Sequence, residues 1–101
     1  MEKRYSLIHN AAQHRYEFRL DGGIAYVEYE PDGGIYRLTH TIVPPRFEGQ
    51  GIAAELVAAT LEEFRRRDEM IVPQCSYIVR YIERHPEWQA LVARQVPETK
   101  A

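Results

Sequence analysis

The sequence predicts an α+β fold, in which a mostly antiparallel sheet contains one parallel β–α–β step. The first half of the chain alternates polar and apolar residues between turn signals, which is the pattern of half-buried strands. Residues 51–67 then carry apolar side chains at helical spacing, and a short apolar run, residues 70–72, follows them. Because a strand that follows one crossover helix runs parallel to the strand before it, this order predicts the parallel step.

Four strands are expected before residue 44. Residues 5–8 are a candidate first strand. The next three are marked by alternating side chains: Tyr16, Phe18 and Leu20, then Ala25, Val27 and Tyr29, then Tyr36, Leu38, His40 and Ile42. Glycine-containing turns at residues 21–23 and 31–34 join them. An antiparallel meander is the simplest arrangement of this pattern.

The spacing of apolar residues changes from that of a strand to that of a helix after the two prolines at residues 44 and 45. Proline has no amide hydrogen to donate, so the ladder is expected to end there. A long helix over residues 51–67 is then predicted, because one stripe of it is apolar. The stripe consists of Ala53, Leu56, Val57, Thr60, Leu61 and Phe64.

Short C-terminal helices complete the predicted fold. Residues 70–72 form a buried strand beside the fourth, and residues 77–82 form a second helix. A break at residues 85–87 places proline at the start of a last short helix. Its core-facing residues are Trp88, Leu91 and Val92. The tail from Val96 is expected to fray.

Length and composition are typical of one globular domain, over residues 1–101 with its core in residues 5–95. The net charge of −2 provides no global positive field for nucleic acid or an anionic membrane. The N-terminal residues lack the apolar run of a secretory signal, and no stretch is long enough to span a bilayer. The single cysteine, Cys75, cannot form an internal disulfide. We therefore expect a cytoplasmic protein.

The connection between the fourth strand and the long helix has the composition of an anion-binding site. It reads Arg46-Phe47-Glu48-Gly49-Gln50-Gly51-Ile52-Ala53. Gly49 and Gly51 allow backbone angles closed to other residues, so several amides can converge on one small volume. The first helical turn adds unpaired amides and a partial positive charge. A phosphate or pyrophosphate is expected here, although two glycines alone are better explained by a tight strand-to-helix turn.

This connection resembles the [Gln/Arg]-x-x-Gly-x-[Gly/Ala] pattern of the GNAT superfamily of N-acetyltransferases. Arg46, Gly49 and Gly51 occupy the specified positions. The flanking segments, residues 38–44 and 71–77, are similar to a minimal single-domain branch of these enzymes, and so is the closing segment, residues 81–88. The resemblance spans nearly the whole chain, and it implies a GNAT-like fold.

The resemblance also implies acetyl-CoA as cosubstrate and an unidentified amine or protein as acceptor. The amides of residues 47–53 would hold the pyrophosphate, and the end of the fourth strand would pair with the peptide-like pantetheine arm. The implied coenzyme-binding residues are Ile42, Val43, Arg46, Phe47, Glu48, Gly49, Gln50, Gly51, Ile52 and Ala53. As an anion, Glu48 is expected to point away from the pyrophosphate.

Acyl transfer to an amine needs proton acceptors and donors, and two residues are candidates. Cys75 is expected at a helix start, where the helix dipole favours the thiolate. His40 precedes the pantetheine-binding stretch, and imidazole exchanges protons near neutral pH. The branch carries a cysteine and a histidine at these matching positions. Each has a structural alternative: Cys75 as a small packing residue, and His40 as a core residue on the face of Leu38.

Two further classes of function stay open at this point. A coenzyme A sensor or interaction module would keep the fold and catalyse little, and a plain interaction domain would bind no coenzyme. The segment between the first two strands, residues 9–15, is too short for the helices that wall the acceptor site in full-sized members. The other histidines have no spacing that places them on one metal. The tyrosines at 26, 29, 36, 77 and 81 are expected to pack in the sheet and helices, with proton donation as the alternative for Tyr77 and Tyr81, which follow the candidate thiol.

Overall fold

The computed structural model describes residues 4–93 and contains a five-stranded sheet in the order β1-β2-β3-β4-β5. The strands are β1 (Ile8–Asn10), β2 (Arg15–Leu20), β3 (Gly23–Asp32), β4 (Ile35–Ile42) and β5 (Met70–Pro73). Neighbours pair antiparallel except β4 and β5, which pair parallel. The predicted mostly antiparallel sheet with one parallel step is therefore confirmed.

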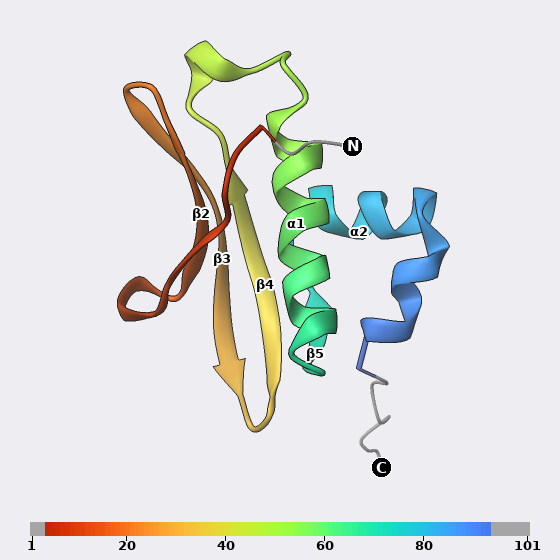
Figure 1. Ribbon diagram of the computed structural model, residues 1–101. Coiled ribbons are helices and arrows are strands. Elements are labelled where there is room, and N and C mark those ends of the chain that lie inside the picture. The colour runs from red at the N-terminus through yellow and green to blue at the C-terminus, as the bar shows by residue number, and fades with distance from the viewer. Residues whose placement is uncertain (1–3, 94–101) are drawn as a thin grey trace.

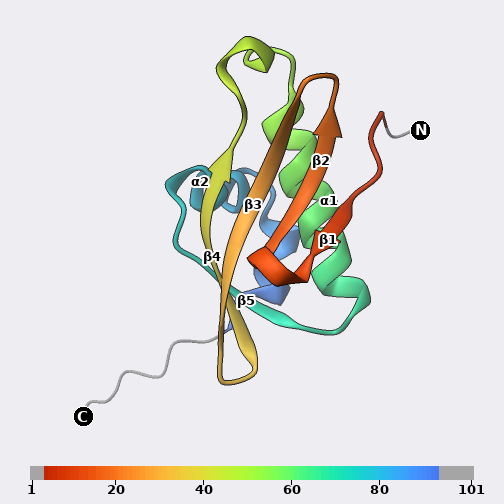
Figure 2. The same cartoon turned by 90° about the vertical axis from the view of Figure 1, so that its left-hand side faces the viewer.

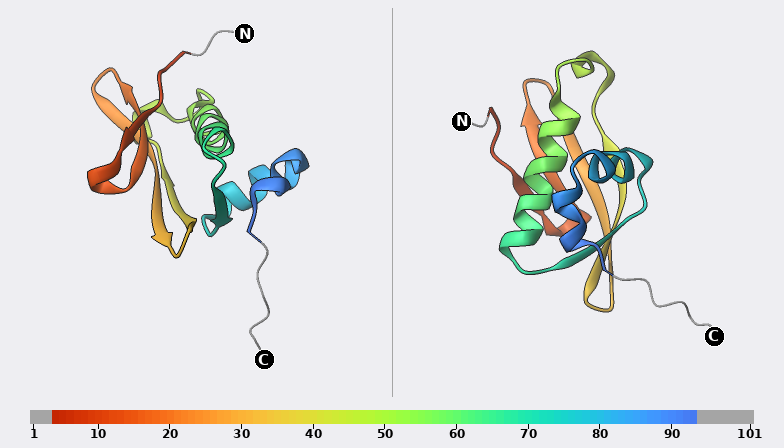
Figure 3. Two further views of the ribbon diagram at one scale, coloured as in Figure 1. Left: turned by 60° about the horizontal axis from the view of Figure 1, so that its bottom comes forward. Right: turned by 90° about the vertical axis from the view of Figure 1, so that its right-hand side faces the viewer.

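Two α-helices and three 3-10 turns complete the described residues. The helices are α1 (Ile52–Arg66) and α2 (Ser76–Arg84), and the turns are η1 (Ala11–Gln13), η2 (Pro45–Phe47) and η3 (Pro86–Leu91). Figures 1 and 2 show α1 and α2 on the same side of the sheet, and Figure 3 shows η3 beside them. In these views no helix of the described residues covers the other side, which we call the outer face.

The core lies between the sheet and α1. The predicted stripe of α1 is buried at Leu56, Val57, Thr60, Leu61 and Phe64, and the inward side chains of β2 and β3 meet it. Those side chains are Tyr16, Phe18, Ala25, Val27 and Tyr29. Burial of this apolar surface, at roughly 25 cal/mol per Å², is the main term holding the helix on the sheet.

The first strand differs from the prediction. It covers Ile8–Asn10 instead of residues 5–8. The preceding chain is held by α1: Arg4 forms hydrogen bonds to the Glu55 carboxylate at 2.9 and 3.2 Å. Tyr5 packs its ring on Phe18, with centroids 5.2 Å apart. The Arg4 amide is thus bonded to α1, and Tyr5 contacts β2 through its ring alone, so ladder pairing starts later than the residue types suggest.

A β-bulge interrupts the pairing of β3 with β4. Tyr29 lies opposite Leu38, whereas Glu28 lies opposite His40, so Thr39 is an extra residue on β4. The alternation therefore shifts at this point. Leu38 is fully buried, His40 is exposed, and Thr41 lies opposite the buried Val27.

The bulge overturns one prediction about His40. The sequence pattern placed its side chain on the face of Leu38, but it lies on the outer face with Ile42. A core role for this histidine is therefore wrong. The physical reason is the extra residue, since a shift of one position moves every following side chain to the other side of the sheet.

The C-terminal part of the described chain closes the structure beside β5. The last predicted helix is a 3-10 turn, η3, which buries Trp88 and Leu91 as expected. After it the backbone returns to β5, where Val92 bridges Ile71 and the Ala93 amide donates to the Ile71 carbonyl at 2.8 Å. Val96 lies outside the described residues. Within residues 4–93, the helices are too short or too polar to cross a membrane.

Candidate functional site

The connection from β4 to α1 exposes a run of amides. Gly49 and Gly51 adopt φ of +82° and +78°, a region that favours glycine. The first helical hydrogen bond of α1 runs from the Glu55 amide to the Gly51 carbonyl. Within residues 4–93, no acceptor is bonded to the amides of residues 49–54. Partial positive charge therefore gathers at the start of α1, as an anion-binding site requires.

The loop is held in place from outside. The Arg4 guanidinium donates to the Gln50 carbonyl at 2.9 Å and pairs with Glu55, in the first turn of α1, at 2.8 Å. On the inner side, the amides of Phe47 and Glu48 close the η2 turn onto the carbonyls of Pro44 and Pro45. The amides of Phe47 and Glu48, which were predicted to contact the pyrophosphate, are therefore already bonded within the loop, and the amides of residues 49–54 remain available.

A groove forms where β4 and β5 separate. Their pairing ends at Leu38 opposite Pro73, and the amides of Gln74 and Cys75 both bond to the Leu38 carbonyl, at 2.9 and 3.0 Å. Beyond this point β4 continues to Ile42, whereas the other chain turns into α2. The last residues of β4 thus keep β3 on one side and have no strand on the side of α2 within the described chain.

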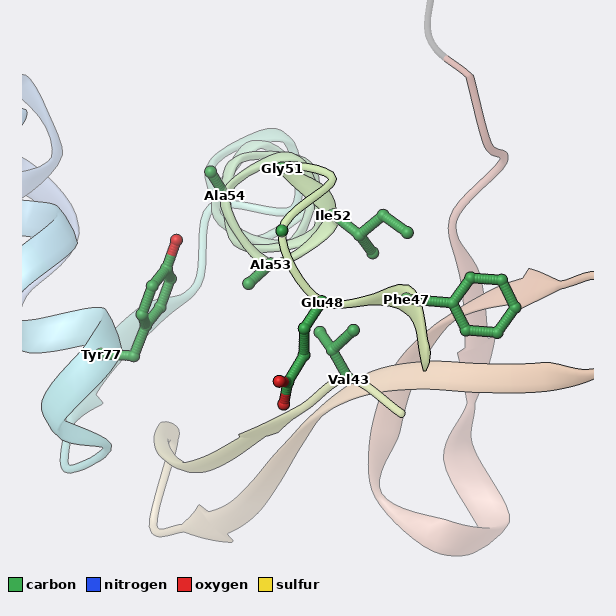
Figure 4. Close-up of a pocket in the computed structure, with 9 residues that line it drawn as sticks. Val43, Phe47, Glu48, Gly51, Ile52, Ala53, Ala54 and Tyr77 are labelled. Carbon is green, nitrogen blue, oxygen red and sulfur yellow. The ribbon is translucent and has the colours of Figure 1, made fainter. Parts of the chain in front are cut away.

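Two overlapping pockets occupy this groove. The pocket at the loop has a volume of about 230 Å³ and is lined by Val43, Phe47, Glu48, Gly49, Gly51, Ile52, Ala53, Ala54 and Tyr77. The pocket at the strand end, of about 360 Å³, is lined by Thr41, Ile42, Val43, Glu48, Ala53 and Tyr77. In Figure 4 the Tyr77 ring faces Ala53 and Ala54 across the opening, and Val43 lies between the strand and the loop.

Of the ten residues predicted to bind the coenzyme, eight line these pockets and two do not. The exceptions are Arg46 and Gln50. The Arg46 guanidinium donates to the Asp21 carbonyl at 3.0 Å and lies over the Phe47 ring, 5.0 Å from its centroid. Its approach to the β2–β3 turn requires glycine at position 22, because a Cβ there would overlap the guanidinium.

Two further residues line the pockets in ways that the predictions can be compared with. Glu48 was expected to point away from the pyrophosphate; it lines both pockets, and in Figure 4 its carboxylate is directed toward the strand end that carries Val43. Tyr77 was expected to pack in the interior, but it is 36% exposed and lines the same pockets. Helical periodicity could have found Tyr77, because it immediately precedes Ile78, the first residue of the buried stripe of Ile78 and Ile82, and so lies off that stripe.

Cys75 lies behind Thr41, which lines the pocket at the strand end, and Cys75 itself lines neither groove pocket. It is the N-cap of α2, as predicted, and it is half-buried. Its thiol donates to the Thr41 hydroxyl, with Sγ 3.5 Å from Oγ1. Sequence reasoning missed Thr41, because its inward orientation depends on the bulge and leaves no signal in local periodicity.

His40 lies on the outer face, so the structure does not bring the two catalytic candidates together on one side of β4. The imidazole is 64% exposed, and its Nδ1 is 2.8 Å from Oε1 of Glu28. A Nδ1–H donated to this carboxylate leaves Nε2 free to accept a proton. His40 therefore offers a base toward the outer face, whereas the Cys75 thiol is directed to Thr41 on the other side of β4.

The comparisons with known proteins agree with this geometry. A solution NMR structure of a GCN5-like protein from Staphylococcus aureus is similar to this chain with a TM-score of 0.68 at 20% sequence identity. The match covers 98% of this chain and 97% of that one, and it confirms the GNAT-like fold. None of the curated proteins is significantly similar in sequence. The sequence model of the GCN5-related N-acetyltransferase family matches residues 15–91, and the chain therefore belongs to this family.

Proposed function

We propose that this chain binds acetyl-CoA in the groove between β4 and α2 and transfers its acetyl group to an amine. The observation that carries the proposal is the run of unbonded amides at residues 49–54, at the mouth of a groove that leads to the unpaired end of β4. A pyrophosphate fits the amides, because they supply converging donors and the helix dipole. The pantetheine arm fits the strand end, because its amides bond as a strand would.

In the reaction, the amine nitrogen bonds to the thioester carbonyl carbon and the carbon–sulfur bond breaks. The proton lost by the amine must be accepted, and the departing thiolate must gain one. In this proposal His40 accepts the first proton, from an amine that approaches on the outer face, and its contact with Glu28 orients the imidazole. The Thr41 hydroxyl lines the groove and accepts a hydrogen bond from the Cys75 thiol, so this pair can serve as the proton donor.

A covalent route through Cys75 is the alternative to direct attack. The thiolate would bond to the acetyl carbon, release coenzyme A as the thiol, and pass the acetyl group to the amine. Mass spectrometry after incubation with acetyl-CoA distinguishes the two routes. An acetyl adduct that is absent from Cys75→Ala supports the covalent route, and an adduct that persists in this variant excludes Cys75 as carrier.

Calorimetry of acetyl-CoA binding tests the site itself. Gly49→Val places a side chain in the loop and strains its φ of +82°, so affinity should fall by more than about tenfold. Gly34→Val is the matched control: its φ is +97°, and like Gly49 it has no atom within 4 Å of an added Cβ, but it lies in the β3–β4 turn. Unchanged affinity in Gly49→Val would show that the site is misplaced.

A non-catalytic coenzyme A-binding module is the second candidate. It is favoured by the placement of His40 and Cys75 on opposite sides of β4, and by the region between β1 and β2, where η1 is only three residues long. An acceptor thus finds no helical wall in the described chain. Release of free thiol from acetyl-CoA with a panel of amines and peptides supports the transferase. Tight binding without turnover across that panel supports the module.

A further inference from the structure

Arg80 and Arg84 are distinctive among the arginines of the described chain. Seven others pair with carboxylates, and Arg46 donates to a backbone carbonyl. Arg80 and Arg84 form no ion pair or side-chain hydrogen bond with residues 4–93. Both are exposed, and they lie one helical turn apart on α2, so their charges add on one face.

The same face of α2 carries two tyrosines. Tyr77, Arg80, Tyr81 and Arg84 follow the spacing i, i+3, i+4 and i+7, while Ile78 and Ile82 are buried on the other side of the helix. With Ala54 and His85, these four residues line a pocket of about 300 Å³. Because Tyr77 and Ala54 also line the pocket at the loop, the two pockets adjoin.

The charge in the pocket lined by Arg80 and Arg84 is positive. Glu83 and Glu87 are near in sequence, but neither lines it. Burial raises the pKa of the Tyr81 phenol, and Tyr77 and Glu87 add to the rise, so this ring stays neutral at physiological pH. The Tyr81 ring packs on the imidazole of His85, with ring centroids 4.3 Å apart. Two guanidinium groups beside exposed aromatic surface are suited to a phosphorylated nucleoside, since arginine binds phosphate oxygens and rings stack on bases.

We propose that Arg80 and Arg84 bind the 3′-phosphate of coenzyme A, with Tyr77 and Tyr81 against its adenosine. This inference rests on the proposed function, because it continues the coenzyme from the pyrophosphate at residues 49–54 past Ala54 and onto α2. It assigns binding residues to the adenosine 3′-phosphate end of coenzyme A, for which the β4–α1 loop supplies none. It also predicts that the protein discriminates coenzyme A from its analogue without the 3′-phosphate.

Calorimetry with coenzyme A and dephospho-coenzyme A tests this site. The wild type should bind coenzyme A about tenfold more tightly than the dephospho form or better. In Arg80→Gln/Arg84→Gln, the affinity for coenzyme A should fall to that for dephospho-coenzyme A, and the latter should not change. Arg37→Gln removes one arginine by the same substitution at the β3–β4 hairpin, where Arg37 pairs with Asp32, and should keep the discrimination.

The outcomes separate the two proposals. Equal binding of both compounds by the wild type, or an equal loss for both in the double variant, would overturn the arginine site and leave the proposed function standing. No binding of either compound would overturn both. A second measurement uses the wild type alone: adenosine 3′,5′-bisphosphate should displace coenzyme A at lower concentration than adenosine 5′-phosphate. Equal potency of the two nucleotides would also contradict the site.

Discussion

At the scale of single residues, Glu17 is the most constrained charge in the described chain. Its side chain is 1% exposed and lies on the outer face of β2. It accepts hydrogen bonds from Arg15 at 2.8 Å, Asn10 at 2.9 Å and Arg19 at 3.2 Å. Burial acts to raise the pKa of this carboxyl, but the three donors outweigh burial and hold the pKa below its ordinary value. Ionised Glu17 therefore stabilises the native state.

Glu17→Gln should lower the free energy of unfolding at pH 7 by about 1–3 kcal/mol, because a buried charge-assisted network is weakened. The pH dependence should change too. The native pKa lies below the unfolded one, so the wild-type contribution is complete above about pH 4.5 and is lost as pH falls through the native pKa. Urea unfolding at about ten pH values between 3 and 7 should show that the free energy of unfolding depends less on pH in the variant than in the wild type. The control is Glu30→Gln, an exposed substitution on β3, which should keep the wild-type pH dependence of the free energy of unfolding.

His40 is the residue whose proposed role is easiest to separate from binding. His40→Gln should reduce kcat by about 10²-fold or more while the affinity for acetyl-CoA stays unchanged, because the side chain faces away from the groove. Glu28→Gln should reduce kcat less, since it only loosens the orientation of the imidazole. Steady-state rates and calorimetry measure the two effects. Full activity in His40→Gln would exclude this histidine as the base.

At the scale of elements, the bulge in β4 connects the sheet to the groove. It adds Thr39 to the strand, and the Thr39 hydroxyl donates to the Glu28 carbonyl at 3.1 Å. Bulges bend a strand and increase its twist. The pairing of β4 with β5 ends at Leu38, immediately before this bend. We infer that the bend is what keeps the end of β4 away from α2.

Deletion of Thr39 should therefore give a folded protein with a narrower groove. Because Leu38 and His40 already occupy consecutive pairing positions opposite Tyr29 and Glu28, the deletion restores regular pairing without moving other side chains to a new face. Affinity for acetyl-CoA should fall by at least about tenfold, while the circular dichroism spectrum and cooperative unfolding are retained. Thr39→Ala keeps the bulge and should bind normally. Wild-type affinity in the folded deletion variant would refute this role of the bulge.

At the scale of the whole molecule, the helices of residues 4–93 that cover the sheet lie on one side of it. A chain of this size has one core and a small margin of stability, so each large buried side chain contributes a substantial share. Trp88 is such a residue. It is 7% exposed, it brings η3 into the core, and the Arg65 guanidinium of α1 lies 4.7 Å from its ring centroid.

Trp88→Ala should cost about 3–5 kcal/mol in the free energy of unfolding, because it leaves a cavity between η3 and α1. Trp88→Phe fills most of the space and should cost less. Arg65→Gln removes only the contact of the cation with the ring and should cost less than about 1 kcal/mol. Urea unfolding of the three variants measures these differences. A loss for Trp88→Ala no larger than that for Arg65→Gln would show that η3 does not brace the core.

Most of the element order and the position of the groove loop were predictable from local signals. The apolar stripe of α1, the alternation in β2 and the glycines at 49 and 51 each reflect a requirement that nearby residues impose on one another. Such signals report which face of an element is apolar and where the chain turns. They also placed Cys75 at the start of α2, because a proline-ended strand and a helical period meet there.

Other features were decided only by contacts between distant segments. The start of β1 depends on Arg4 reaching Glu55, and the direction of Arg46 depends on the β2–β3 turn. The faces of His40 and Thr41 depend on one extra residue in the register with β3. The sequence by itself determined the elements and the GNAT-like loop, because periodicity and backbone freedom are local. Tertiary structure decided which side chains meet around the groove, because register and packing join residues that are far apart in the chain.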